Sequence, residues 1–444
     1  MTEASMLDLP LLPPFALSPL AALLVGGACA FLLTYLFTFG VIALSKRFGW
    51  LDKPSERRVH KNAVPRLGGV AMFLSFALIS LLFYTLTSGL QSKEIIIYWL
   101  FLAGSVLIVA VHAYDDVKGL KPWPKLLAQT LTVLIVLGPF GSKFWGVLFY
   151  GFNNPIGAAV AKPGLPWYRV PEITLFIHNP EISLLAIPAI LFTWFWMVGM
   201  MNTVNLIDGL DGLATGVVAI TGIFITIISW TLHQQSIAIL SMIFTGAVLG
   251  FLPHNWNPAK IFMGDSGSQF LGLGLAVLSI IGGAKVALAL MVLGIPILDV
   301  AIVMINRIRR GQHPLHYDKT HLHHRLLATG LSVKQICYVF YCITILFGIL
   351  ALSLPRIYKI AGIALVGIVM IALVVWIDRR QRERGIPMKL DGSPQTPPTT
   401  PYPTSMPSGE SRSRDDTDLY QVHEASMSER NTPSEYEAQR EQVS

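Results

Sequence analysis

Carboxylate and amide side chains are grouped along the chain in a way that suits metal or phosphate chemistry. Asp115 and Asp116 are adjacent, and Asp265 stands among small residues in the segment FMGDSGS. The segment NTVNLIDGLDGLA carries oxygen-bearing side chains at every third position: Asn202, Asn205, Asp208 and Asp211. Because no Cys₄ or three-histidine ligand pattern accompanies them, these oxygens suit Mg²⁺ or Mn²⁺ better than zinc. The sequence therefore predicts a Mg²⁺ or Mn²⁺ site made by aspartates.

The same aspartates have simpler explanations. Neighbouring residues on a helix point about 100° apart, so Asp115 and Asp116 can divide between a metal and a substrate, or both can be solvated at a helix end. Asp208 or Asp211 could cap the helix that follows, although capping leaves the two asparagines unexplained. The GDSG letters around Asp265 occur in serine proteases, but those need a β-barrel domain that this helical sequence does not predict.

Three histidines lie within four residues of the segment THLHHRLL: His321, His323 and His324. They could bind a metal, transfer a proton or hold an anion. On a continuous helix, His323 would point about 160° away from His321, so a three-histidine zinc cluster is disfavoured. Arg307 and other basic residues precede them in the sequence. Histidines among such residues favour binding of an anion.

Two further polar positions are less specific. Lys125 and Gln129 are one helical turn apart and share a face, which suits phosphate or base edges, although lysines commonly extend to the membrane surface from helix ends. Asp299 lies inside an apolar segment, two turns before Arg307. It is either a structural residue or a part of the site.

The elements that must position these residues are membrane helices. The 444 residues are 53% hydrophobic and 13% charged, against about 25% charged residues in soluble domains. Apolar runs of roughly 17–25 residues can span a bilayer, and about eleven are present. They lie near 16–44, 67–90, 95–113, 125–147, 183–204, 212–232, 236–252, 268–283, 286–304, 333–354 and 359–378. We therefore expect an all-α polytopic membrane protein with a transmembrane domain over 16–378.

The basic residues orient this topology. The connection KRFGWLDKPSERRVHKNAVPR after the first span holds seven Lys or Arg against two acids, whereas connections near 91–94, 232–235 and 282–285 are poor in positive charge. The positive-inside rule then places residues 1–15 outside and the basic connections in the cytoplasm. Residues 148–182 form an external loop or hairpin, and residues 379–444 form a disordered cytoplasmic tail.

All the polar groups then fall at cytoplasmic helix ends. An aspartate at a helix centre costs roughly 2.5–3.5 kcal/mol on insertion scales, so acidic residues this near the membrane need a reason. Their collection on one face predicts a single site assembled from several connections. A secondary transporter would instead carry polar residues near the bilayer midplane in repeated halves, and the sequence has no such repeat. The positive charge therefore indicates a membrane face and not a nucleic-acid partner.

Taken together, the motifs over about 50–335 resemble those of the polyprenyl-phosphate N-acetylhexosamine-1-phosphate transferases, within glycosyltransferase family 4. The motifs are Asp52-x-Pro54, His60, Pro65-x-x-Gly68-Gly69, Asp115-Asp116, Lys125-x-x-x-Gln129, Asn202 with Asp208-Gly-x-Asp211-Gly, Asn255-x-x-Pro258-Ala259-x-x-Phe262-Met-Gly-Asp265, and His321-x-His323-His324. The interrupted histidine motif resembles the WecA/TagO branch, which uses UDP-GlcNAc. The MraY branch, which uses UDP-MurNAc-pentapeptide, has three consecutive histidines there.

The resemblance implies a bacterial cell-membrane enzyme that transfers GlcNAc-1-phosphate from UDP-GlcNAc to undecaprenyl (polyprenyl) phosphate and releases UMP. UDP-GalNAc and UDP-MurNAc-pentapeptide remain alternative donors, and the oligomeric state stays open between monomer and homodimer. It also implies that Asp265 binds Mg²⁺, assisted by Asp116, and that Asp115 acts on the lipid phosphate. The implied substrate-binding residues are Asp52, His60, Lys125, Asn202, Asn205, Asp208, Asp211, Asn255, Phe262, Arg307, His321, His323 and His324.

Overall fold

The computed structural model of the chain describes ten stretches of sequence. They are residues 17–52, 63–84, 92–140, 143–149, 151–153, 172–174, 187–281, 285–309, 321–354 and 358–383. All belong to one compact unit, Met1–Thr399, and the second unit, Thr400–Ser444, lies outside the described residues. The predicted N-terminal segment 1–15, most of the predicted tail and His60 also lie outside them.

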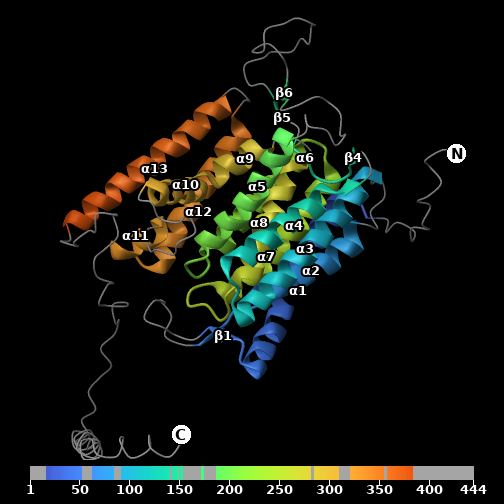
Figure 1. Cartoon of the computed structure of the whole chain (residues 1–444), viewed down its shortest axis with the longest axis horizontal. Coiled ribbons are helices and arrows are strands. Elements are labelled where there is room, and N and C mark those ends of the chain that lie inside the picture. The colour runs from blue at the N-terminus through green and yellow to red at the C-terminus, as the bar shows by residue number, and fades with distance from the viewer. Residues whose placement is uncertain are drawn as a thin grey trace, which may run out of the picture. The chain divides into compact units, whose positions relative to one another are not determined.

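Helices make up most of the described chain, and they lie side by side in Figure 1. The first eight are α1 (Pro19–Phe48), α2 (Gly68–Tyr84), α3 (Ser92–Lys118), α4 (Pro122–Leu137), α5 (Ile187–Ile207), α6 (Leu213–Thr231), α7 (Gln235–Asn255) and α8 (Gly264–Ile280). The others are α9 (Lys285–Val292), α10 (Gly294–Arg309), α11 (Leu322–Ala328), α12 (Val333–Ser353) and α13 (Tyr358–Glu383). Each of the eleven predicted spans corresponds to a helix or, for the ninth, to a pair of helices.

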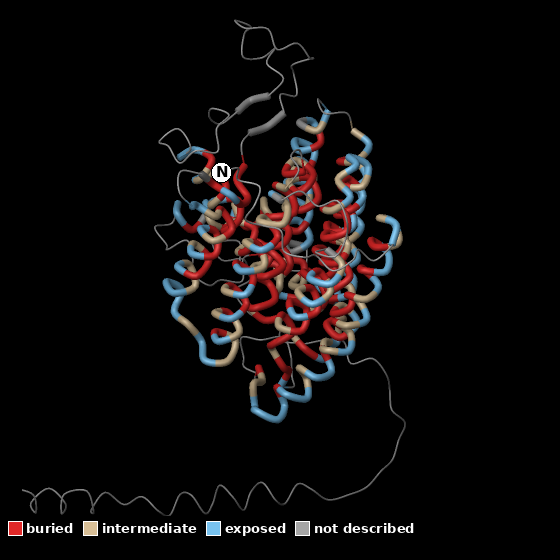
Figure 2. The backbone as a smooth tube through the Cα atoms, turned by 90° about the vertical axis from the view of Figure 1, so that its right-hand side faces the viewer, coloured by how far each residue is buried: buried red, intermediate tan, exposed pale blue. Residues whose placement is uncertain are grey.

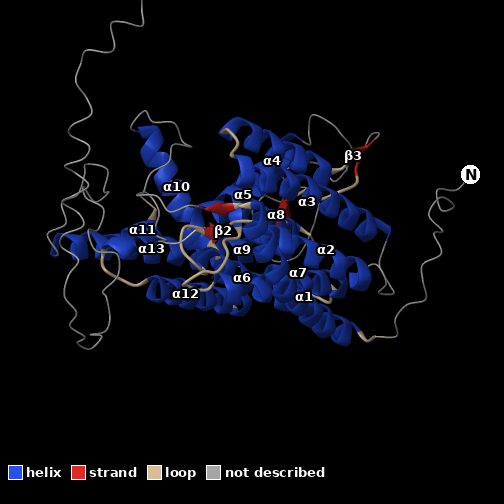
Figure 3. Cartoon of the chain, turned by 90° about the horizontal axis from the view of Figure 1, so that it is seen from below, coloured by secondary structure: helices blue, strands red, loops and turns tan. Residues whose placement is uncertain are grey.

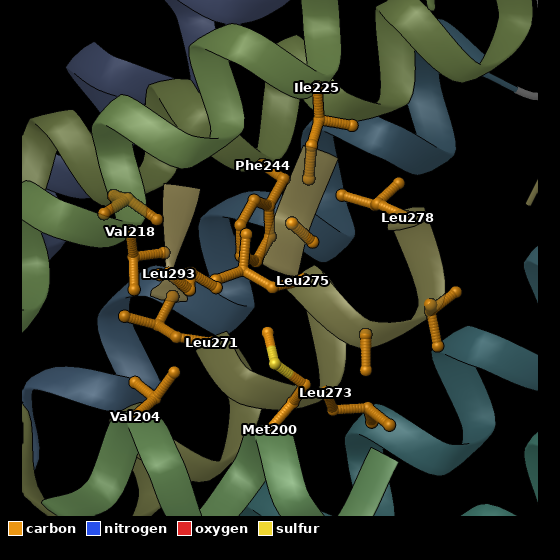
Figure 4. Packing of buried hydrophobic residues seen from close by; sticks show 14 of the residues in the cluster. Met200, Val204, Val218, Ile225, Phe244, Leu271, Leu273, Leu275, Leu278 and Leu293 are labelled. Carbon is orange, nitrogen blue, oxygen red and sulfur yellow. The ribbon is translucent and has the colours of Figure 1, made fainter. Parts of the chain in front are cut away.

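Helix α8 is enclosed by the other helices. It packs against α2, α3, α5, α6, α7 and α9. Every residue in 266–280 is buried, so this helix contributes to the interior throughout its length. Figure 4 shows the packing around it, where Leu271 and Leu275 of α8 meet Phe244 of α7 and Val204 of α5. Because only its first turn reaches the end of the bundle, α8 can present Asp265 there on a rigid support.

Close packing of α2 on α8 depends on glycine. A Cβ atom on Gly69 would lie 2.1 Å from the backbone nitrogen of Gly267, a contact that no rotamer change can relieve. The strand-like segment before α2 is hydrogen-bonded to the segment before α8: Phe262 N donates to Pro65 O at 2.8 Å, and Gly69 N donates to Met263 O at 2.8 Å. The N-terminal ends of α2 and α8 are thereby held together.

The outer surface of the bundle is apolar. In Figure 2 the buried parts of the backbone, in red, gather in the interior of the bundle, and the exposed parts, in pale blue, lie mostly at its outer sides and ends. Leu32 and Leu36 of α1 are 57% and 61% exposed, and Ile368 and Ile371 of α13 are 63% and 65% exposed. Among the described residues, six helices are long and apolar enough to cross a membrane, or seven if α9 and α10 form one broken span. The chain is a multi-pass helical membrane protein, while its total number of spans and its direction of insertion remain predictions.

Two predicted spans differ from the structure in detail. Helix α4 ends at Leu137, because Gly138 adopts the left-handed conformation (φ 59°) and Pro139 follows it. The predicted ninth span is broken between α9 and α10, which are bent by 72°. Gly294 and Pro296 open α10, and a proline there lacks the N–H that a continuous helix would need.

Strands are few and short in the described residues, as Figure 3 shows. Strands β1 (Leu51–Asp52) and β2 (Val64–Pro65) pair antiparallel, as do β3 (Pro139–Phe140) and β4 (Lys143–Phe144). Strand β5 (Gly151–Asn153) pairs antiparallel with β6 (Glu172–Thr174) within the segment expected to be a loop or hairpin. The β1–β2 pair bears on the site, because it carries Asp52 and leads into α2.

Candidate active site

Asp116 holds the beginning of α8. Its Oδ1 accepts a hydrogen bond from the backbone N–H of Asp265 at 2.8 Å, and its Oδ2 accepts from Ser266 N at 3.0 Å and Ser266 Oγ at 2.8 Å. The side chain of Asp116 is 0% exposed. The first N–H groups of a helix lack intrahelical partners and carry a partial positive charge, so a carboxylate from another helix stabilises them. Asp116 of α3 therefore fixes the position of Asp265.

Lys125 joins two other carboxylates. Its Nζ lies 2.5 Å from Asp115 Oδ2 and 2.8 Å from Asp265 Oδ2. Asn205 Nδ2 donates to the second oxygen of Asp265 at 3.1 Å. Side-chain exposure is 5% for Asp115 and 22% for Asp265. Asp265 is thus the most accessible carboxylate of this group. The group is assembled from four helices, because Asp115 belongs to α3, Lys125 to α4, Asn205 to α5 and Asp265 to α8.

An amide network lies one turn deeper. Gln129 Nε2 donates to Gln269 Oε1 at 2.9 Å, and Gln129 and Asn202 exchange hydrogen bonds at 3.1 and 3.3 Å. These bonds link α4, α5 and α8. Asn202, predicted to bind substrate, therefore belongs to this supporting network through Gln129, while Asn205 donates a hydrogen bond to Asp265 directly.

Asp211 and Asn255 tie two connections together. Asp211 Oδ2 accepts hydrogen bonds from Asn257 Nδ2 at 2.9 Å and Ala259 N at 3.0 Å. Asn255 Oδ1 accepts from Gly212 N at 3.1 Å and Thr215 Oγ1 at 2.7 Å. Asn255 thus holds Gly212, the N-cap residue of α6, and the side chain of Thr215 in its first turn, while Asp211 binds the 257–259 connection. The capping alternative for the aspartates does not hold.

Asp208 is the least compensated carboxyl of the site. It lies in the turn between α5 and α6 and is half-buried. Burial raises the pKa of Asp208 well above its ordinary value, and the negative charge of Asp265 and Asp116 raises it further, while Arg66 opposes the shift. A carboxyl group held in this state favours a proton or a cation as its partner.

Arg66 and His112 are site residues that sequence reasoning missed. The Arg66 guanidinium lies 3.7 Å from Asp52 Oδ1 and 3.9 Å from Asp116 Oδ1, so it connects the β1–β2 pair to the carboxylate cluster. His112 is fully buried one turn before Asp115, and its ring is under the electrostatic influence of Asp265, Asp115 and Lys125. Arg66 could have been found as the charged residue inside the quoted Pro65-x-x-Gly68-Gly69 motif, and His112 from its spacing of three before Asp115.

The histidine segment is placed by Asp299 of α10. Asp299 Oδ2 accepts a hydrogen bond from His321 Nδ1 at 3.0 Å, and its Oδ1 accepts from the backbone N–H of Leu322 at 3.0 Å. His321 has extended backbone angles (φ −61°, ψ 146°) and precedes α11. The expectation that His323 points away from His321 assumed a continuous helix and is wrong. Their rings are instead nearly parallel, with centroids 6.0 Å apart.

His323 lies against the turn that carries Asp208. A Cβ atom on Gly209 would meet His323 Nε2 at 2.3 Å, so the ring rests on the glycine backbone. Burial lowers the pKa of His323 well below its ordinary value, and its histidine neighbours add to that shift. His324 is half-buried, and Arg307 is buried in the last turn of α10. A direct contact of Arg307 or the half-buried Phe262 with substrate stays a prediction.

The structure thus brings together residues that are far apart in sequence. Hydrogen bonds and ion pairs link Asp52, Arg66, Asp115, Asp116, Lys125, Asn205 and Asp265, and Gly209 brings the histidine segment to Asp208. Among the described residues, no group of three His, Cys, Asp or Glu side chains is arranged to hold a metal ion by itself. A carboxylate cluster with cationic neighbours at the end of a membrane bundle can bind phosphorylated substrates together with a hydrated cation.

This combination defines a class: multi-pass membrane enzymes with a polar site at the ends of their helices. The model of the family described as glycosyl transferase family 4 matches residues 98–283. The chain is 33% identical over 335 residues to the probable undecaprenyl-phosphate N-acetylglucosaminyl 1-phosphate transferase of Bacillus subtilis, which covers 73% of this chain and 84% of that protein. The chain belongs to glycosyl transferase family 4, whose members among these relatives are phosphotransferases.

Two other relatives differ in their named substrates. The decaprenyl-phosphate N-acetylglucosaminephosphotransferase of Mycolicibacterium smegmatis is 34% identical over 357 residues, covering 73% of this chain and 80% of that protein. The phospho-N-acetylmuramoyl-pentapeptide-transferase of Leuconostoc mesenteroides is 30% identical over 340 residues, covering 73% of this chain and 96% of that protein.

Proposed function

We propose that the protein transfers GlcNAc-1-phosphate from UDP-GlcNAc to undecaprenyl (polyprenyl) phosphate, giving polyprenyl-diphosphate-GlcNAc and UMP. The observation that carries the proposal is the Asp115–Lys125–Asp265 cluster in a chain one-third identical to transferases named for this reaction. The interrupted histidine motif favours UDP-GlcNAc. UDP-MurNAc-pentapeptide is the alternative donor suggested by the third relative, and UDP-GalNAc is a further one.

The charge of the site supports a divalent cation as the third component. Both substrates are anionic, yet carboxyl groups outnumber the cationic groups, Arg66 and Lys125, in the cluster of described residues. Mg²⁺ commonly uses one or two carboxylates together with substrate phosphates and water, so a preformed cage is not required. The ammonium of Lys125 between Asp115 and Asp265 marks a place that suits positive charge. The residues therefore fit Mg²⁺ or Mn²⁺.

Asp265 is the carboxylate that would hold this cation, because it is the most accessible one and stands at the beginning of a rigid helix. Asp116 would act mainly by holding the beginning of α8, because both of its oxygens already accept hydrogen bonds from Asp265 and Ser266. In binding the cation it would only assist Asp265. When bound, the cation would neutralise the diphosphate and favour departure of UMP. Asp208, in the neighbouring turn, would gain a compensating positive charge.

Asp115 and Lys125 would act on the phosphates. Asp115 accepts a hydrogen bond from the backbone N–H of Leu120 and is paired with Lys125, so its carboxylate is oriented at the α3–α4 turn. It would orient the lipid phosphate and accept a proton if one is present. Lys125 would bind a phosphate oxygen, since an ammonium has three donors and two are engaged here. Aligning two anions and compensating their charge is the main requirement of phosphoryl transfer.

The site would face the cytoplasm of a bacterial cell membrane. The proposal is supported by the basic connections at the same helix ends as the cluster, and UDP-sugars are made in the cytoplasm. The product would be the first lipid-linked intermediate of a cell-surface polysaccharide or teichoic acid. A homodimer remains compatible with this function.

A direct test uses purified full-length protein, undecaprenyl phosphate, Mg²⁺ and separate UDP-sugars, with UMP as the measured product. We expect UMP with UDP-GlcNAc and loss of UMP when EDTA removes the cation. UMP with only UDP-MurNAc-pentapeptide or only UDP-GalNAc would contradict the choice of sugar and keep the reaction class. No UMP with any donor would contradict the transferase proposal.

A further inference from the structure

The acidic turn, which carries Asp208 and Asp211 between α5 and α6, is contacted by two side chains of α12. Tyr341 Oη donates a hydrogen bond to Gly212 O at 2.5 Å. One helical turn earlier, Cys337 Sγ donates to Asp211 O at 3.4 Å. We propose that Tyr341 is a positioning residue, which fixes the backbone of the acidic turn and thereby the place of the Asp208 carboxyl beside the cation. This inference rests on the proposed function.

Both contacts are made to the backbone where α6 begins. Helix α6 starts at Leu213, and the oxygen of Gly212 accepts its first intrahelical hydrogen bond, from Gly216 N at 2.9 Å. A carbonyl oxygen has two lone pairs, so this oxygen can accept from Tyr341 as well. The thiol of Cys337 is a weak donor, so Tyr341 makes the stronger of the two contacts. Two successive peptide groups are thereby bound, which restricts the orientation of the turn as well as its position.

The same backbone is also bound from α7. Gly212 N donates to Asn255 Oδ1 at 3.1 Å, and Gly212 has the left-handed conformation (φ 82°) that favours glycine. A Cβ atom on Gly212 would lie 3.0 Å from the ring of Trp256, whose centroid is 6.2 Å from that of Tyr341. The N–H group of Gly212 is therefore bound by α7 and its C=O group by α12, so both helices are needed to hold the turn.

Helix α12 offers a fixed support for this contact. It packs against α6, and the two helices lie side by side in Figure 3. A Cβ atom on Gly216 would lie 2.0 Å from Tyr341 Oη. Two turns further along α12, a Cβ atom on Gly348 would lie 2.1 Å from the ring of Phe224. Both glycines thus let the helices approach closely, and the Tyr341 hydroxyl reaches the acidic turn from a helix whose own position is set by other contacts.

The place of the acidic turn matters because of Asp208. Its backbone N–H donates to Asn205 O at 3.3 Å, and the side chain of Asn205 binds Asp265. Within the described residues the Asp208 carboxyl accepts no hydrogen bond, so its place depends on the backbone of the turn. The attraction between a cation and a carboxylate falls with distance, so a displaced or mobile Asp208 would weaken cation binding.

The first experiment measures hydrogen exchange of the full-length protein without substrate or divalent ions. Tyr341→Phe removes only the hydroxyl group that donates to Gly212 O. We expect the amide groups of residues 208–213 to exchange roughly 3- to 10-fold faster, the change in local opening that corresponds to one lost hydrogen bond. The amide groups of α12 should exchange as in the wild type. Unchanged exchange in the acidic turn, or equal acceleration throughout α12, would overturn the inference.

Tyr338→Phe is the matched control in the same helix. Tyr338 is 56% exposed, and its ring also contacts Trp256, with centroids 5.8 Å apart. In the described part of the chain its hydroxyl makes no hydrogen bond, so its removal should leave exchange of the acidic turn unchanged. An effect as large as that of Tyr341→Phe would show that the turn responds to any change in these aromatic side chains, and would contradict the assigned role of Tyr341.

The second experiment measures Mn²⁺ binding to the purified full-length protein by electron paramagnetic resonance. We expect the Kd for Mn²⁺ to rise roughly 3- to 10-fold in Tyr341→Phe and to stay near the wild-type value in Tyr338→Phe. Faster exchange with an unchanged Kd would refute the link between the acidic turn and the cation. If the wild type makes no UMP with any donor, the proposed function fails, while hydrogen exchange and Mn²⁺ binding still decide the role of Tyr341.

Discussion

At the scale of single residues, the carboxylates divide by what they bind. Asp116 and Asp211 accept hydrogen bonds from backbone and side-chain groups of the 256–266 region, through both oxygens of Asp116 and through Oδ2 of Asp211. Asp265 is bound by the side chains of Lys125 and Asn205 and is more exposed than Asp115 or Asp116, and Asp208 lies in the turn beside it. Carboxylates bound to backbone groups stabilise the fold, whereas an accessible carboxylate such as Asp265 and a poorly compensated one such as Asp208 are suited to substrate and cation.

Replacing Asp265 with asparagine tests its place at the cation. Asp265→Asn keeps the hydrogen bond from Asn205 but removes the charge, so we expect UMP release to fall by at least about 100-fold, in line with the loss of an electrostatic catalytic group. The variant should still insert into the membrane, and its unfolding temperature should stay near that of the wild type. Near-normal turnover would remove Asp265 from the proposed cation site.

Replacing Asp208 with asparagine should stabilise the protein while lowering its activity. The raised pKa of Asp208 means that the folded state disfavours its ionised form, so this residue lowers stability as pH rises through that pKa. An uncharged amide removes the penalty, and we expect the free energy of unfolding to increase at neutral pH without divalent ions. Thermal unfolding in detergent would measure it.

The control for Asp208→Asn is Asp211→Ala, which changes the other aspartate in the connection between α5 and α6. Asp211 accepts two hydrogen bonds, so its loss leaves Asn257 and Ala259 N–H groups without an acceptor. We expect destabilisation of about 1–3 kcal/mol. The account of this turn would be wrong if Asp208→Asn destabilised the protein as much as Asp211→Ala does.

At the scale of elements, the site depends on how closely α2 and α8 approach each other. Gly69 brings the two backbones into contact, and the bonds from Phe262 to Pro65 and from Gly69 to Met263 align the segments before both helices. The same segments carry Arg66 and Asp265. A change in this helix contact would therefore displace the Arg66 guanidinium and the Asp265 carboxylate together.

Gly69→Ala tests this contact. The added Cβ would meet backbone atoms of Gly267 and Ser266 at 2.1–2.5 Å, so the helices must separate, and we expect destabilisation of about 3 kcal/mol or more together with loss of UMP release. Gly40→Ala in α1 is the matched control, because nothing lies within 4 Å of its Cβ position. That variant should be neutral or slightly stabilising. Equal stability of the two variants would contradict the account.

The elements also show where sequence reasoning succeeds and where it stops. Hydropathy identified a helix for every predicted span, because length and apolar content are local properties. It missed the end of α4 at Gly138 and the break before Gly294, which depend on local backbone chemistry. The sequence also did not reveal that His321 precedes α11, because its position depends on a hydrogen bond to Asp299, a residue of another helix. Residue types therefore predicted the chemistry, and tertiary contacts decided the partners.

At the scale of the whole molecule, the account requires the cluster to face the side of the membrane where UDP-sugars are present. Labelling of single cysteines in intact cells tests this, after replacement of Cys29, Cys337 and Cys342 with serine. We expect an impermeant maleimide to label Gln235→Cys from outside and to label Lys260→Cys only after permeabilisation. Both positions are exposed: Gln235 is the first residue of α7, and Lys260 lies in the connection between α7 and α8. External labelling at residue 260 would reverse the topology.

The central claim is that the sugar moves together with its phosphate. UDP-GlcNAc labelled at the phosphorus attached to the sugar distinguishes this from transfer of the sugar alone. The account predicts that, with undecaprenyl phosphate and Mg²⁺, the label appears in the lipid fraction as the diphosphate and the released nucleotide is unlabelled UMP. Label recovered in released UDP, with no labelled phosphate in the lipid, would contradict it.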